Sequence, residues 1–276
     1  AYDYYSRDDG VATTNNHGTH VTALAAGYVK DRAGHVTFRG AAPAAQILSM
    51  KIFPNGSGGG TDDTIILRAL EDAWNLGADV VNLSVGTGAG FSASDTMDGI
   101  YCRAFTQMAR SGVLICCAAG NSAANVQSKT WGQPLPSGGY TDYGSGCAPG
   151  SFYGALAVAA ASRTEDGTAA IADYSAWGPG SGLHLTPALT AFGGPVTSAG
   201  ASSNQQYRSD EGTSMASPYA AGSFAVLLQS LREQGVTDKQ EAAALAQSLL
   251  ASRSRLLTEN GLPVSPRRQG AGFIDL

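Results

Sequence analysis

Four apolar runs of strand length alternate with segments of helical periodicity, and this alternation limits the choice of fold more than any other feature. The runs occupy residues 46–52, 79–85, 112–119 and 155–161. They lack the regular polar alternation of half-exposed strands, so both of their faces are expected to be buried. Buried strands separated by helices are typical of a mostly parallel sheet with helices on both faces. We therefore predict an α/β fold with three layers, in one domain that spans residues 1–276.

The expected helices lie between and after these runs. Thr61 is expected to cap a helix that ends at Gly77, with Asp62 and Asp63 in its first turn. The other helices are expected at residues 95–110, from Ser214 to about Arg232, and at residues 238–252. Residues 55–60, 122–150 and 178–210 are expected to be irregular, and long ordered loops often carry binding sites.

Charge and composition argue against several classes of partner. The formal net charge is −5, and the 17 Lys and Arg residues form no long basic block, so nucleic-acid binding is not expected. No apolar run reaches the roughly 18 residues needed to span a bilayer. The 36 glycines among 276 residues are about twice the average share of roughly 7%, which indicates many tight turns and close backbone contacts.

Three separate segments each place one polar side chain among glycines and other small residues. His17 lies in NNHGTHV, Asn121 in AAGNS and Ser214 in GTSMASP. A serine hydroxyl is a weak nucleophile unless a base removes its proton, and a neutral histidine suits that task near pH 7. His17 and Ser214 are therefore predicted to be the base and the nucleophile of an acyl-transfer reaction.

Acyl transfer also requires hydrogen-bond donors for the negatively charged oxygen of its intermediate. The candidates are the Asn121 side-chain amide and the Ser214 N–H, the latter at a helix N-terminus with Pro218 still in the tolerated first turn. Taken singly, each segment is more often a simple turn or cap. All three in one chain, in the order His, Asn, Ser, are hard to explain by turn chemistry alone.

The same segments resemble the histidine, oxyanion and serine motifs of the subtilisin-like serine proteases. The resemblance covers nearly the whole chain and includes LSVG (83–86) and GCAPGSFYGALAVAA (146–160). Three further segments, YSAWGP (174–179), LTPALTAFGG (185–194) and SPRRQGAGFIDL (265–276), are more similar to one branch, the cell-envelope proteinases of Gram-positive bacteria that include lactocepins and the streptococcal complement-cleaving peptidases. The resemblance implies a subtilisin-like fold and a secreted or cell-wall-associated serine endopeptidase that forms an acyl-enzyme on Ser214.

The resemblance also implies a substrate site. In that family the segment similar to LSVG pairs with an extended peptide, and the segment similar to GCAPG lines the pocket for the side chain before the cleaved bond. The residues expected to bind a protein or peptide substrate are Ser84, Val85, Gly86, Ala119, Gly120, Gly146 and Cys147.

No cofactor is expected. Structural calcium is common among the relatives, but no acidic loop here has suitable ligand spacing, so no metal ligands are assigned. His20 forms an H-x-x-H pair with His17, but no third ligand lies nearby in the sequence. His20 is therefore expected to make a structural hydrogen bond.

The chain departs from the family pattern at the triad aspartate. In the family this residue lies on an early strand, farther upstream of the histidine than the 16 residues that precede His17. Asp3, Asp8 and Asp9 remain as candidates, but the pair Asp9-Gly10 is expected to form a surface turn. We therefore expect the triad aspartate upstream of Ala1. Loss of the orienting carboxylate can lower kcat about 10⁴-fold, so this chain alone is expected to be weakly active or inactive.

A second departure concerns an insertion. Only residues 162–173 lie where many cell-envelope proteinases carry a protease-associated domain, so that domain is either natively absent or was removed. Further domains are expected after Leu276, because the relatives usually continue beyond an ending similar to GAGFIDL.

Two other functions compete with a protease. One is a pseudoprotease, a subtilisin-like scaffold that binds a peptide or a protein partner without cutting it. The missing aspartate favours this hypothesis, whereas the presence of His17, Asn121 and Ser214 argues against it. The other is an α/β-hydrolase esterase, which would require G-x-S-x-G around the serine and a histidine after it. Every histidine of this chain precedes Ser214.

Overall fold

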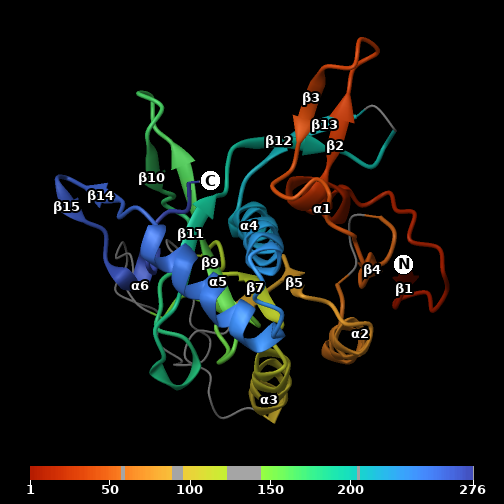
Figure 1. Cartoon of the computed structure of the whole chain (residues 1–276), viewed down its shortest axis with the longest axis horizontal. Coiled ribbons are helices and arrows are strands. Elements are labelled where there is room, and N and C mark those ends of the chain that lie inside the picture. The colour runs from red at the N-terminus through yellow and green to blue at the C-terminus, as the bar shows by residue number, and fades with distance from the viewer. Residues whose placement is uncertain (57–59, 89–95, 123–143, 204–205, 276) are drawn as a thin grey trace.

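A five-stranded sheet forms the centre of the fold (Figure 1). The computed structural model describes residues 1–56, 60–88, 96–122, 144–203 and 206–275. The strands pair in the order β10-β9-β7-β5, and β11 also pairs with β9. Strands β5, β7, β9 and β11 are parallel to their neighbours, whereas β10 is antiparallel to β9. The bounds are Val80–Leu83 for β5, Leu114–Ala118 for β7, Leu156–Arg163 for β9, Ala169–Ile171 for β10 and Leu189–Phe192 for β11.

Helices cover both faces of this sheet, which gives the three predicted layers. On one face α4 packs against β7 and β9, and α1 and α5 pack against α4. On the other face α2 and α3 share a buried cluster with β5 and β7. The bounds are Asn16–Ala26 for α1, Asp63–Asn75 for α2, Thr96–Arg110 for α3, Thr213–Glu233 for α4 and Lys239–Arg253 for α5. The predicted α/β fold class is therefore confirmed.

The central strand β7 shows why the sheet is buried on both faces. Leu114 and Cys116 point into the cluster under α4 and α5, whereas Ile115 and Cys117 point into the cluster under α2 and α3. Each of these four side chains is at most 1% exposed. Successive side chains of a strand point to opposite faces, so a strand covered on both sides must be apolar throughout.

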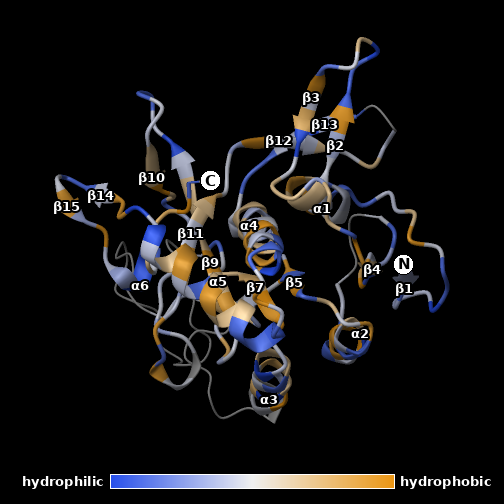
Figure 2. Ribbon diagram, viewed as in Figure 1, coloured by the Kyte–Doolittle hydropathy of each residue, from blue (hydrophilic) through white to orange (hydrophobic). Residues whose placement is uncertain are grey.

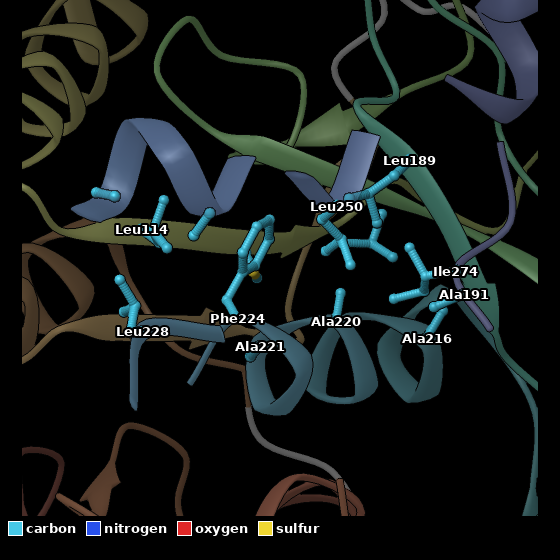
Figure 3. Close-up of a cluster of buried hydrophobic side chains, with 14 of the residues drawn as sticks. Leu114, Leu189, Ala191, Ala216, Ala220, Ala221, Phe224, Leu228, Leu250 and Ile274 are labelled. Atoms are coloured by element: carbon cyan, nitrogen blue, oxygen red, sulfur yellow. The ribbon is translucent and has the colours of Figure 1, made fainter. Parts of the chain in front are cut away.

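Helix α4 fits between the sheet and its neighbouring helices because its side chains are mostly small. Ala216 and Ala220 let the helix approach the sheet closely, and Phe224 fills the space next to Leu250 of α5 (Figure 3). Helices α2 and α3 instead show both apolar and polar colours, as expected of amphipathic helices at the surface (Figure 2).

The remaining elements are short. Two-stranded sheets pair β1 with β4, β2 with β3, β6 with β8, β12 with β13, and β14 with β15. Their bounds are Tyr2–Asp3 (β1), Tyr28–Lys30 (β2), Val36–Arg39 (β3), Met50–Lys51 (β4), Thr87–Gly88 (β6), Cys147–Ala148 (β8), Val196–Ala199 (β12), Tyr207–Asp210 (β13), Thr258–Glu259 (β14) and Leu262–Pro263 (β15). A 3₁₀ turn, η1, spans Ser181–Leu183, and α6 spans Pro266–Gln269. None of the described helices is both long enough and apolar enough to cross a membrane.

Several sequence-based boundaries were wrong. The run at residues 46–52 is a strand only at Met50–Lys51. The stretch 178–210, expected to be irregular, contains β11, β12 and β13. Helix α2 is capped by Asp62 instead of Thr61, because the Asp62 carboxylate accepts a hydrogen bond from the Ile65 N–H at 2.9 Å.

Pro218 lies farther into its helix than expected. Helix α4 begins at Thr213, so Pro218 is the sixth helical residue and lies in the second turn. Parts of three other expectations, at residues 57–59, 123–143 and 95, lie outside the described residues.

Candidate active site

His17 is held at the first turn of α1 by the residue that caps this helix. The Asn15 side chain accepts a hydrogen bond from the His17 N–H at 3.0 Å. This cap satisfies one of the N–H groups that lack a partner at a helix start. The His17 ring is half-buried and its Nε2 lies 2.9 Å from the main-chain oxygen of Ser84.

Ser214 lies in the first turn of α4, two residues after a glycine that no other residue could replace easily. Gly212 has φ +147°, and a Cβ there would lie 3.0 Å from Asn121 Nδ2. The N–H of Ser214 points from a helix N-terminus, where N–H groups have no acceptor within the helix and the helix dipole favours negative charge. The Ser214 Oγ donates a long hydrogen bond of 3.4 Å to Ser84 O.

The fold therefore brings the predicted base and nucleophile to one oxygen atom. His17 and Ser214 are 197 residues apart in the sequence, yet Nε2 of His17 and Oγ of Ser214 both contact Ser84 O. A carbonyl oxygen only accepts hydrogen bonds, so Nε2 carries the ring proton in this arrangement. To accept the Ser214 proton, the ring must carry its proton on Nδ1 instead.

Asn121 is oriented by Thr213, the residue before Ser214. Asn121 Oδ1 accepts hydrogen bonds from the Thr213 N–H at 2.9 Å and from the Thr213 hydroxyl at 2.8 Å. The Thr213 hydroxyl in turn accepts a hydrogen bond from the Gly120 N–H at 3.0 Å. Because Oδ1 is occupied, the amide group of Asn121 presents its Nδ2 donor on the side of Gly212. This arrangement suits an oxyanion hole.

The residues expected to bind substrate come together from three segments. Ser84, Val85 and Gly86 connect β5 to β6, and β6 pairs with β8, which contains Cys147. The N–H of Cys147 donates to Ala119 O at 3.0 Å. A Cβ at Gly86 would collide with Cys147, and a Cβ at Gly120 would lie only 3.1 Å from Cys147 N, so both segments pass close to Cys147. Gly146 and Ala119 are buried beside them.

Cys147 remains a neutral thiol in this position. Its side chain is 8% exposed, and burial raises the pKa of the thiol to about 12. The Sγ donates to Ala118 O at 3.3 Å. The thiol therefore acts as a small apolar group between Gly86 and Gly120, and it is not a nucleophile at neutral pH.

None of the three early aspartates is hydrogen-bonded to His17 in the described part of the chain. Asp8 accepts from the Gly10 N–H at 2.7 Å in an exposed bend that includes Asp9, as predicted for a surface turn. Asp3 is 1% exposed and forms an ion pair of 2.6 Å with Lys51. Burial alone would raise the pKa of Asp3, but hydrogen bonds from Lys51 and Ser6 outweigh burial and hold that pKa below its ordinary value.

The buried ion pair between Asp3 and Lys51 predicts a large effect on stability. Replacing Lys51 by methionine should lower the free energy of unfolding at pH 7 by about 3–5 kcal/mol, because the Asp3 carboxylate stays buried without its partner. A lowered pKa means that the pair stabilises the fold above the ordinary carboxyl pKa and stops doing so as the pH falls through the lowered value. The difference between the two proteins should therefore shrink toward pH 3.

Urea unfolding at several pH values measures this difference. Lys30→Met, at an exposed position of β2, is the matched control and should change stability little. A loss below about 1 kcal/mol in Lys51→Met at pH 7 would show that the pair is not stabilising.

His20 makes the structural contacts that the sequence predicted. It is fully buried, and its Nε2 lies 3.2 Å from both Val196 O and Arg208 O, which joins α1 to the β12–β13 hairpin. Burial lowers the pKa of His20 and favours the neutral ring. Across the residues that the structure describes, no group of three or more His, Cys, Asp or Glu side chains is arranged to hold a metal ion.

Comparison with known proteins identifies the family. The sequence profile described as "Subtilase family" matches residues 1–272. The chain belongs to the subtilase family. This is a family of serine proteases, so the match supports a serine protease function.

Relatives of this subtilase include proteinases of bacteria and plants. The chain is 32% identical over 192 residues to the PI-type proteinase of Lactococcus lactis subsp. cremoris, which covers 67% of this chain and 10% of that protein. It is 31% identical over 216 residues to subtilisin DY of Bacillus licheniformis, and this match covers 78% of this chain and 64% of that protein. The chain thus spans about a tenth of the length of its lactococcal relatives.

Solved structures agree with the fold of this subtilase. The S41 psychrophilic protease superposes with a TM-score of 0.74 at 26% identity, covering 99% of this chain and 83% of that chain. Sphericase superposes with a TM-score of 0.72 at 25% identity, covering 99% and 82%.

Sequence analysis missed several polar residues that support the site of this subtilase. Thr213 orients Asn121. Asn82 and Ser217, from β5 and α4, are hydrogen-bonded to each other. One signal was present for Asn82, because it is a polar residue in the middle of an otherwise apolar strand. No comparable signal marks Thr213 or Ser217, which look like ordinary residues of a helix start.

Proposed function

We propose that this chain is the catalytic domain of a serine endopeptidase that hydrolyses peptide bonds of proteins through an acyl-enzyme on Ser214. The observation that carries the proposal is the meeting of His17 Nε2 and Ser214 Oγ at the carbonyl oxygen of Ser84. The family and the proteinases among the relatives support the same reaction.

In the proposed mechanism, His17 moves the proton in both halves of the reaction. Ser214 Oγ attacks the peptide carbonyl carbon while His17 Nε2 takes the hydroxyl proton. The negative charge on the carbonyl oxygen is stabilised by the Ser214 N–H and Asn121 Nδ2. His17 then gives its proton to the leaving amine, which leaves the acyl group on Ser214. Water attacks this ester in the same way and releases the second product.

We also propose that a carboxylate from a segment preceding Ala1 orients His17. A carboxylate at Nδ1 would keep the ring proton there and leave Nε2 able to accept the proton of Ser214. Two observations support this proposal. Asp3 and Asp8 are engaged elsewhere. The contact of Nε2 with Ser84 O requires the proton on Nε2, and in this tautomer Nε2 cannot accept the Ser214 proton.

The central sheet offers a position for such a segment. Among the described strands, β5 is hydrogen-bonded to β7 alone, so its other edge can accept a further strand. Carboxyl ends of parallel strands meet at one edge of a sheet, which here is the edge where Ser84 follows β5. A carboxylate at the end of an added parallel strand would therefore lie near His17.

Substrate would bind in extended form along Ser84, Val85 and Gly86. Main-chain groups of this segment would pair with the peptide as an added strand. Cys147 would form the floor of the adjoining pocket, and its side chain between Gly86 and Gly120 favours small substrate side chains there. The similarity to the lactococcal proteinases supports an extracellular or cell-wall location.

Covalent labelling tests the proposed function directly. A fluorophosphonate probe should add one mass increment to this chain, read by intact mass, and none to a Ser214→Ala variant. A longer version that adds a segment carrying the proposed carboxylate should be labelled far faster, because this carboxylate would orient His17. Equal failure of both folded versions would instead favour a scaffold that binds peptides without cutting them.

A further inference from the structure

The nucleophile lies in a helical turn that lacks one of its backbone hydrogen bonds. In an α-helix, the N–H of residue 218 would donate to the carbonyl oxygen of residue 214. Residue 218 is a proline, which has no N–H, and α4 begins at Thr213, so this position lies inside the helix. The carbonyl oxygen of Ser214 therefore has no donor at the usual position.

A side chain from outside the helix supplies a donor in its place. The Ser84 hydroxyl donates to Ser214 O at 2.7 Å. Ser84 follows β5 and is 7% exposed, so this bond is shielded from water. A short, shielded hydrogen bond of this kind fixes the main chain of the nucleophile against the end of the sheet.

The Ser84 hydroxyl is itself held by Asn82, which is held in turn by Ser217. Asn82 Nδ2 donates to Ser84 Oγ at 3.0 Å, and the Ser217 hydroxyl donates to Asn82 Oδ1 at 2.7 Å. All donors point the same way, from Ser217 through Asn82 and Ser84 to the Ser214 carbonyl. The chain of bonds thus leaves α4 at Ser217 and returns to it at Ser214.

The main chain of Ser84 faces the reacting side chains. Its carbonyl oxygen is the atom that His17 Nε2 and Ser214 Oγ share. One residue therefore contacts the base and the nucleophile through its main chain, and holds the nucleophile's main chain through its hydroxyl. A shift of Ser84 would change the relative position of both side chains.

We infer that Asn82, Ser84 and Ser217 form a positioning network that replaces the hydrogen bond removed by Pro218 and fixes Ser214 relative to His17. This inference rests on the proposed function for its effect on rate. The network itself is a statement about how the Ser214 turn is held.

The test is a double-mutant cycle between Ser84 and Pro218. Ser84→Ala should lower the rate constant for fluorophosphonate labelling of Ser214 about 10- to 100-fold, because small misplacements at a reacting centre cost that much. Pro218→Ala restores an N–H at the usual helical position. The double variant should therefore recover at least part of the lost rate and of the Tm, which Ser84→Ala alone should lower by about 2–4 °C.

Two further variants sharpen the comparison. Ser217→Ala removes the far end of the network and should have a smaller effect than Ser84→Ala. Ser223→Ala is the matched control, since this buried serine of the same helix donates to Tyr219 O at 2.9 Å but belongs to no chain leading to Ser214. It should lower the Tm without slowing the labelling.

The outcomes separate this inference from the proposed function. Recovery of rate and Tm in the double variant supports the network, whereas a Ser84→Ala protein with unchanged Tm and rate, or a double variant that recovers neither, overturns it. If neither the unaltered chain nor the longer version is labelled at Ser214, the proposed function fails. The Tm values of Ser84→Ala and of the double variant then still decide the inference. A higher Tm in the double variant than in Ser84→Ala would show that the network holds the Ser214 carbonyl, and an equal Tm would show that it does not.

Discussion

Replacing His17 by alanine is expected to lower kcat/KM for peptide hydrolysis by about 10⁴-fold or more, measured on the protein with its full natural sequence. The Ser214 hydroxyl donates to Ser84 O, the oxygen that His17 Nε2 also contacts. Without a base, the hydroxyl keeps its proton and remains a weak nucleophile. The activity that remains would come from substrate binding and from the oxyanion donors.

The matched control for this variant is His35→Ala. His35 is exposed and pairs with Asp31 in the turn between β2 and β3, away from Ser214. Its loss should leave kcat/KM unchanged. A His17→Ala protein that is folded and retains more than about a tenth of the activity would show that His17 is not the base.

Replacing Asn121 by alanine is expected to lower kcat by about 10²- to 10³-fold with little change in KM. The amide donates to the oxygen only when that oxygen becomes negatively charged, so the loss belongs to the transition state and amounts to about 3–4 kcal/mol. The effect should be large here because Thr213 holds Oδ1 through two hydrogen bonds and so fixes the direction of Nδ2 before substrate arrives.

Steady-state kinetics with one peptide substrate distinguishes this role from a binding role. A rise in KM at constant kcat would mean that Asn121 binds the ground state and is not part of an oxyanion hole. Asn75→Ala, at the exposed end of α2, is the matched control and should change neither constant.

Long helices and strands could be predicted from the sequence, whereas short ones could not. The buried strands β7 and β9 and the long helices could be predicted, because their apolar patterns extend over many residues. The hairpins and β11 could not, since strands of two to four residues carry too little pattern. Their existence depends on contacts with distant segments, such as that of His20 with the β12–β13 hairpin.

In the site, too, some features could be predicted from the sequence and others could not. His17, Asn121 and Ser214 could be named because each lies among small residues that make room for close contacts. Ser84 was expected only as a substrate-binding residue, yet its carbonyl oxygen contacts both His17 Nε2 and Ser214 Oγ. Hydrogen bonds between a side chain and a distant main-chain atom leave no periodic trace in a sequence, and the partner of the Ser84 hydroxyl lies 130 residues away.

The position of α4 has a consequence for how this fold would resist proteolytic cleavage. A protease exposes every molecule to cleavage by its neighbours, and cleavage begins where the backbone opens at little cost. Helix α4 packs against the sheet, α1 and α5, so the segment that carries Ser214 is released only when most of the domain opens. The exposed β2–β3 and β14–β15 hairpins would be expected to open first. Early cuts would therefore fall at the periphery and leave the reacting groups in place.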